Sequence, residues 1–170
     1  ITTDESKKLV HNWRTEVQAI MVGTNTAAND NPRLTVRGLN NVKSPLRVIL
    51  DLNLRLPDNL RVFDGSVPTI VLNYSKYEKQ TNLEFIKIKK EKDLVSEILR
   101  VLYELKVQSV FIEGGTKLLE TFIESNKWDE ARVFTGMKEF YEGLKAPILN
   151  QSPSTSLDFG EDNLEFFMNE

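Results

Sequence analysis

The chain has 170 residues, of which 40% are apolar and 28% charged, and its formal net charge is −3. This composition is typical of one globular domain, and the slightly acidic balance argues against a nucleic-acid partner. Without cysteine the chain can form neither disulfides nor thiolate metal sites, and without an apolar run of ~18 residues it offers no membrane span, so we expect a cytoplasmic protein.

The first half of the chain predicts one amphipathic helix followed by buried strands. We expect the helix from Asp4 to Glu16, because Thr3 suits its N-cap and acidic residues fill its first turn, where the helix dipole favours them. Its apolar stripe repeats every four residues at Leu9, Trp13 and Val17. The strands expected in this half cover residues 18–22, 47–51, 68–72 and 83–88.

The second half alternates helices and strands. Asp93 predicts the N-cap of a helix whose apolar face runs from Leu94 to Leu105, and another helix is expected over residues 116–125. The remaining strands are expected at residues 109–112, 130–134, 156–159 and 164–168, the last two as a closing hairpin. This alternation predicts an α/β fold with a mostly parallel central sheet and antiparallel strands at the C-terminal end.

A glycine-rich turn links one of these strands to the helix that follows it. Gly114 and Gly115 let the backbone approach a ligand closely, and the free N–H groups at the helix start, at Thr116 and Lys117, suit a phosphate. The alternative is a plain tight turn that needs positive φ. Glu113 either accepts hydrogen bonds from a substrate or stabilises the helix N-terminus. The turn lacks the G-x-G-x-x-G fingerprint, which disfavours an ordinary Rossmann domain.

A second polar run, residues 23–37, follows the first predicted strand, and we expect it to form a loop. It places hydroxyls, a carboxylate and two guanidiniums close together, which suits a cofactor groove beside a charged substrate. Its segment 29–32 is also typical of a plain Asx-Pro turn. We expect an extended stretch after it, in which Arg33 and Arg37 alternate with apolar residues. A guanidinium on such a stretch suits bidentate phosphate binding.

The end of the first helix contributes further candidates. Arg14 either converges on the same place as Arg37 or is an exposed cation that complements the helix dipole. His11, the single histidine, is expected on the polar side of the helix without a catalytic role. Trp13 and Trp128 are expected in the core rather than against a cofactor.

Together these motifs resemble, in order and in spacing, the reductase domain of the bifunctional riboflavin-biosynthesis deaminase–reductase. The residues that carry the resemblance span most of the chain. They are Ile1-Thr2-Thr3, His11 and Arg14, Val22-Gly23 and Thr26, Asp30-Asn31-Pro32, Leu34-Thr35-Val36-Arg37, Arg47-Val48, Leu50-Asp51, Glu113-Gly114-Gly115 and Leu118.

The resemblance implies a dihydrofolate-reductase-like, three-layer α/β fold over residues 1–170. It also implies a homodimer and the NADPH-dependent reduction of 5-amino-6-(5-phosphoribosylamino)uracil to its ribityl form. The residues on cofactor positions are Thr26, Asp30, Gly114, Gly115, Thr116 and Lys117, and those on substrate positions are Arg14, Leu34, Arg37 and Glu113. Asp30 is our candidate for the catalytic proton relay.

The chain also departs from the family pattern. It lacks the family's first strand, of type K-x-A-x-S-x-D-G, and the zinc-binding deaminase half, so we expect a piece of a longer protein to which a deaminase domain can be fused. Leu52 stands where the family often has a serine, and the stretch 135–143 has its glycines redistributed. Two alternatives stay open: a same-fold reductase of a pterin-like substrate, and a truncated, non-catalytic nucleotide-binding module.

Overall fold

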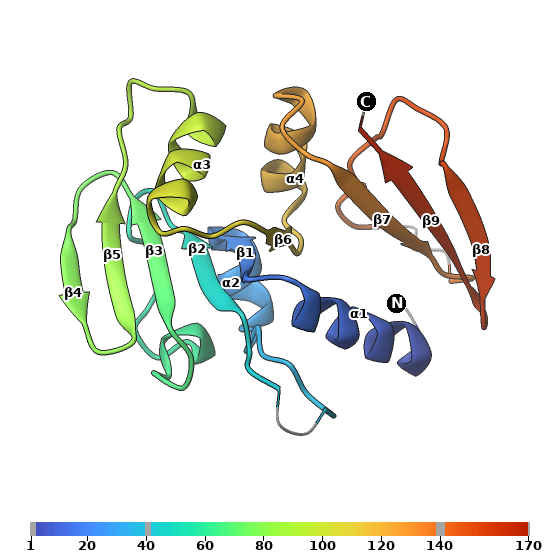
Figure 1. The fold of residues 1–170 in the computed structure, drawn as a ribbon, viewed down its shortest axis with the longest axis horizontal. Helices are drawn as coiled ribbons and strands as arrows, with labels where there is room; N and C mark the ends of the chain where they lie inside the picture. The colour runs from blue at the N-terminus through green and yellow to red at the C-terminus, as the bar shows by residue number, and fades with distance from the viewer. Residues whose placement is uncertain (1–2, 40–41, 139–141, 170) are drawn as a thin grey trace.

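A computed structural model describes residues 3–39, 42–138 and 142–169 (Figure 1). Residues 1–2 of the first motif and part of the stretch 135–143 lie outside the described residues. In chain order the elements are α1 (Asp4–Glu16), β1 (Ala19–Gly23), α2 (Thr24–Asp30), β2 (Leu46–Leu50), the 3₁₀ turn η1 (Arg61–Phe63), β3 (Thr69–Asn73), β4 (Glu78–Gln80), β5 (Leu83–Lys87), α3 (Leu94–Glu104), β6 (Val110–Ile112), α4 (Thr116–Glu124), β7 (Glu130–Thr135), β8 (Thr155–Phe159) and β9 (Asp162–Met168).

The strands form two sheets. Six of them lie in the order β4-β5-β3-β2-β1-β6, and every neighbouring pair is parallel except β4 with β5. The other three form an antiparallel sheet in the order β7-β9-β8 (Figure 1). The prediction of a mostly parallel central sheet with an antiparallel hairpin at the C-terminal end is therefore confirmed.

Both faces of the six-stranded sheet are covered, which makes three layers. In β1, Ala19 and Met21 point into the core that α3 and α4 complete, while Ile20 and Val22 point into the core on the opposite face, where α2 and η1 pack. Alternate residues of one strand thus pack into two different cores, as expected for a parallel sheet that is buried on both sides. Figure 1 shows α3 and α4 on the same side of the sheet.

The helix signals in the sequence are confirmed where side chains cap the helices. The Thr3 hydroxyl accepts a hydrogen bond from the Ser6 N–H at the start of α1, and the Asp93 carboxylate accepts one from the Ser96 N–H at the start of α3. Each bond satisfies an N–H group that has no partner inside the helix. The two helices therefore begin where the sequence predicts.

The prediction of a loop at residues 23–37 is wrong for its first half, which is the helix α2. The helix is short and polar, and Ala27 is its fully buried residue. The sequence therefore has no apolar stripe from which this helix could be predicted. It ends at Asn31, which has φ +41, just before Pro32. The extended stretch expected next is also wrong, because Leu34 has φ +50 and buries its side chain in the core.

The expected core position of Trp13 is confirmed. Its side chain is 7% exposed and stacks on Phe134 of β7 with ring centroids 5.5 Å apart. It also meets Phe111 of β6 and Phe166 of β9 edge-on, at 6.4 and 6.5 Å. Helix α1 therefore contacts both sheets through one aromatic side chain, to which aromatic pairing adds beyond area burial alone.

Arg47 begins one of the motifs that carry the family resemblance, and its contacts show why an arginine stands there. This side chain is fully buried on β2, and its Nη1 atom donates to the Val62 carbonyl at 3.1 Å and to Asp64 Oδ1 at 2.8 Å, while Nη2 donates to the Ser66 hydroxyl at 3.1 Å. Arginine suits this place because its planar fork reaches several acceptors at once. Arg47 therefore fastens the η1 turn to the central sheet.

We expect the Arg47–Asp64 pair to make the protein sensitive to acid. Burial alone would raise the pKa of Asp64, but hydrogen bonds from Arg47 and Ser66 lower it from 3.8 to about 2. Because the pKa of the folded state lies below that of the unfolded chain, the stabilisation is complete above pH 3.8 and is lost as the pH falls toward 2. Melting temperatures measured across this range should fall less steeply in Asp64→Asn than in the wild type; parallel curves would contradict the assignment.

Candidate active site

The candidate site lies at the carboxyl edge of the six-stranded sheet. Because β2, β1 and β6 are neighbours and parallel, their carboxyl ends meet there. The chain leaves these strands at Gly23, Asp51 and Glu113, and the candidate residues other than Arg14 follow β1 and β6 in the sequence. This is the edge at which open α/β sheets bind their ligands.

Thr26 on α2 faces the glycine turn that precedes α4. Gly114 and Gly115 have φ values of +79° and +85°, which is the positive φ that the alternative of a plain tight turn needs. A Cβ atom at Gly115 would lie 3.0 Å from the Thr26 hydroxyl oxygen, and one at Gly114 would lie 3.9 Å from the Thr26 methyl carbon. The structure therefore brings together these residues from the two segments that the sequence singled out.

The start of α4 suits an anion. Its first turn carries no acidic side chain, and the Gly115 carbonyl accepts hydrogen bonds from the N–H groups of Leu118 and Leu119. The Thr116 hydroxyl donates to the Lys145 carbonyl at 3.2 Å, which ties a later loop to this place, and the Lys117 side chain is exposed. The helix dipole and the first N–H groups therefore act together at an accessible helix end.

Arg14 and Glu113 form a nearly buried ion pair at the same edge. Arg14 Nε donates to Glu113 Oε1 at 2.6 Å, and Nη2 donates to Oε2 at 2.5 Å, which is a bidentate geometry. The two side chains are 11% and 17% exposed. The third nitrogen, Nη1, donates to the Thr35 carbonyl at 2.9 Å. The view of Arg14 as an exposed cation at a helix end is therefore wrong, and its predicted convergence on the segment that carries Arg37 is confirmed.

His11 also reaches this segment. It lies one turn before Arg14 on α1, is half-buried, and accepts a hydrogen bond at Nδ1 from the Arg37 N–H at 3.3 Å. Burial lowers the pKa of His11, and the positive charges of Arg14 and Arg37 lower it further. These effects favour the neutral imidazole, which is the form that can accept this bond.

The Asp51 carboxylate is a polar group of the site to which the sequence analysis assigned no role. It is 2% exposed at the end of β2 and accepts a hydrogen bond from the Leu56 N–H at 2.9 Å. The Thr24 hydroxyl donates to the Leu50 carbonyl at 2.8 Å and lies 3.2 Å from the Asp51 carboxylate, so the end of β2 holds the first residue of α2. The position of this acidic residue directly after a buried strand is the sequence feature that could have identified it as a site candidate. Leu52, where the family often has serine, packs against the core that α3 and α4 complete.

The remaining candidates differ in accessibility. Asp30 is exposed at the end of α2, one helical turn after Thr26 and on the same face of the helix. Leu34 is 2% exposed with its side chain in the core, so only its main chain can meet a ligand. The Arg37 side chain is exposed, and its main chain is held by His11. Asp30 and Arg37 therefore offer their side chains to a ligand, whereas Leu34 offers only its main chain.

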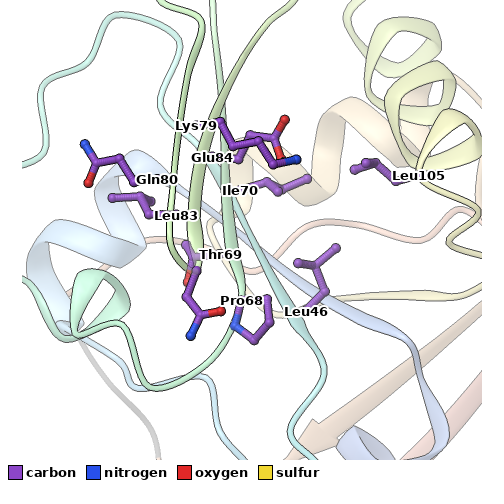
Figure 2. A pocket seen from close by; sticks show the side chains of 10 residues that line it. Leu46, Pro68, Thr69, Ile70, Lys79, Gln80, Leu83, Glu84 and Leu105 are labelled. Atoms are coloured by element: carbon purple, nitrogen blue, oxygen red, sulfur yellow. The ribbon is translucent and has the colours of Figure 1, made fainter.

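A pocket lies at the opposite edge of the sheet, at the amino ends of β2, β3 and β5 and the end of α3 (Figure 2). Its volume is about 290 Å³. Its lining includes Leu46, Ile70, Leu83 and Leu105, and the Lys79–Glu84 ion pair stands at one side. It contains none of the residues that the sequence predicts for a ligand.

Among the described residues, no helix has the length and apolar character needed to cross a membrane.

Comparison with known proteins identifies the family. The family model described as the RibD C-terminal domain matches residues 1–138. The riboflavin biosynthesis protein RibD of Aquifex aeolicus is 35% identical over 98% of this chain and 51% of its own length. The 2,5-diamino-6-ribosylamino-4(3H)-pyrimidinone 5′-phosphate reductase of Archaeoglobus fulgidus is 29% identical over 80% of this chain and 69% of its own length.

A solved structure agrees with this. The diaminohydroxyphosphoribosylaminopyrimidine deaminase/5-amino-6-(5-phosphoribosylamino)uracil reductase of Thermotoga maritima matches 98% of this chain with a TM-score of 0.84 and 29% identity, over 49% of its own chain. The present chain thus spans about half the length of this protein and of the Aquifex protein. Sequence and fold agree, and the chain belongs to the family of the RibD C-terminal domain.

Proposed function

We propose that this chain reduces 5-amino-6-(5-phosphoribosylamino)uracil with NADPH, turning the ribosyl side chain into a ribityl one. One observation carries the proposal: Thr26 lies against the Gly114–Gly115 turn at the start of α4, and the Arg14–Glu113 pair lies directly before that turn. A helix start suited to phosphate and a charged cluster thus share one edge of the sheet. The names of the relatives, a riboflavin biosynthesis protein and a pyrimidinone phosphate reductase, point to the same chemistry.

The residues around the glycine turn fit a dinucleotide cofactor. A side chain at Gly115 would meet Thr26, so glycine keeps the cradle between α2 and α4 open, and no acidic residue in the first turn of α4 repels a phosphate. Gly115, Thr116 and Lys117 would hold a phosphate of NADPH, while Thr26 and Asp30 would face its other half. When bound, NADPH supplies the hydride that reduces the sugar carbon C1′.

The substrate would bind beside this cradle. The exposed guanidinium of Arg37 suits the 5-phosphate of the ribose. Arg14 holds Glu113 in one orientation, and the carboxylate oxygens keep lone pairs with which to accept hydrogen bonds from the N–H groups of the aminouracil. Leu34, whose side chain is buried, would contribute only its main chain to this substrate site. The work of the protein is therefore to position the substrate and its charges, with Asp30 as the proposed proton relay.

An NADPH-oxidation assay tests the proposal. We expect the purified chain to consume NADPH when the phosphoribosylaminouracil is added, and to do so more slowly with the 2,5-diamino-pyrimidinone phosphate named for the archaeal relative. A faster reaction with a dihydropterin would instead favour the same-fold pterin reductase. Tight NADPH binding without turnover of any of these substrates would contradict the proposal and favour a non-catalytic nucleotide-binding module.

The partners of the chain follow from the same proposal. A homodimer, a fused zinc deaminase domain and a cytoplasmic location stay predictions. The named relatives support the fusion, because the Thermotoga protein carries both activities in its name and the present chain matches 49% of it. The archaeal relative, of which the chain covers 69%, is named as the reductase alone.

A further inference from the structure

Two side chains of α1 hold the segment from Thr35 to Arg37 by bonds of opposite polarity. Arg14 Nη1 donates to the Thr35 carbonyl at 2.9 Å, and His11 Nδ1 accepts from the Arg37 N–H at 3.3 Å. His11 and Arg14 are three residues apart, so they lie on one face of the helix. The segment is thus bound through its main chain on both sides of Val36.

This fastening matters because the segment has no regular structure of its own. It lies in neither a helix nor a strand, and it follows Leu34, whose φ is +50°. The Arg37 side chain is exposed, so packing does not fix it. A long flexible side chain binds a phosphate more tightly when its main chain is already placed, because less conformational freedom is lost on binding.

We propose that His11 is a positioning residue for substrate binding: its Nδ1 atom holds the Arg37 main chain so that the guanidinium is presented to the substrate phosphate. This inference rests on the proposed function, and it adds a role for a residue expected to have none. His11 acts through Arg37 and does not touch the substrate itself.

The surroundings of His11 keep the accepting form of the imidazole populated. Nδ1 can accept a hydrogen bond only when it carries no proton. Two charged groups face the ring, Arg14 from its own helix and Arg37 from the segment packed against it. Burial and these two cations lower the pKa of His11, against a smaller opposing effect of the Thr35 main chain.

Two substitutions at His11 separate positioning from packing. In His11→Phe a ring of similar size remains but the acceptor is lost, whereas in His11→Asn the amide oxygen stands near the position of Nδ1. We expect His11→Phe to raise the KM for the phosphoribosylaminouracil about tenfold, with kcat and the KM for NADPH nearly unchanged, and His11→Asn to recover most of this loss. Asn12→Ala, on the exposed side of α1, is the matched control and should behave as the wild type.

Amide hydrogen exchange of Arg37 gives a readout that does not depend on turnover. The Arg37 amide should exchange faster in His11→Phe than in the wild type and in His11→Asn. An unchanged substrate KM in His11→Phe, or an equal loss in His11→Asn, would overturn the inference while the proposed function stands. If the wild type turns over no substrate, the proposed function fails instead, and unchanged Arg37 exchange in His11→Phe would then overturn the fastening as well.

Discussion

Gly115→Val should weaken NADPH binding by about 100-fold, because the substitution damages the phosphate cradle from both sides. The φ of Gly115 is +85°, a conformation that a β-branched residue resists, and the new Cβ would stand 3.0 Å from the Thr26 hydroxyl oxygen. Either the turn or α2 must move, and the N–H groups at the start of α4 then lose their alignment. Quenching of tryptophan fluorescence by NADPH measures the dissociation constant.

Gly65→Val is the matched control for this prediction. Gly65 has a similar φ, +72°, but nothing stands within 4 Å of a Cβ placed there. This variant should suffer a comparable fall in melting temperature while it keeps its NADPH affinity. If both variants bind NADPH equally well, or equally badly, the contact between Thr26 and the glycine turn does not form the cofactor site.

Arg37→Ala should raise the KM for the phosphoribosylaminouracil about 100-fold and leave the NADPH dissociation constant nearly intact. The Arg37 side chain is exposed, so its removal costs little stability, and the phosphate loses a charge-assisted, bidentate partner. Steady-state kinetics with each substrate varied in turn separates the two effects.

Arg33→Ala controls for the loss of one positive charge from the same segment. Arg33 is also exposed, but it precedes the buried Leu34 in the sequence, and the bond to His11 is made by Arg37. Its substrate KM should stay within about threefold of the wild type, as expected for a screened surface charge. Equal loss of substrate and NADPH affinity in Arg37→Ala would contradict its assignment to the phosphate.

The sequence predicts the parts of this fold that local chemistry determines. The helices α1 and α3 carry side-chain caps and regular apolar stripes, so their starts follow from Thr3 and Asp93. The glycine turn also follows from local chemistry, because residues other than glycine resist its φ values. The helix α2 escapes prediction, since a seven-residue polar helix is stabilised by tertiary contacts such as those of Ala27 rather than by propensity.

The contacts between residues of the site could not be predicted from the sequence. The resemblance places Arg14 and Glu113 on substrate positions, but their bond to each other joins residues 99 positions apart, and no local pattern encodes it. The same holds for the bond between His11 and Arg37. The roles of individual site residues stay predictions.

Trp13 offers a spectroscopic signal for the junction between the two sheets. Its indole touches β6 of one sheet and β7 and β9 of the other, and the Arg132 guanidinium lies 4.5 Å from its ring centre. A ring enclosed by phenylalanines and a cation changes its emission when either neighbour leaves. In a Trp128→Phe variant, Trp13 is the remaining tryptophan. A red shift of its emission during unfolding would therefore report when the two sheets separate, independently of the loss of helix.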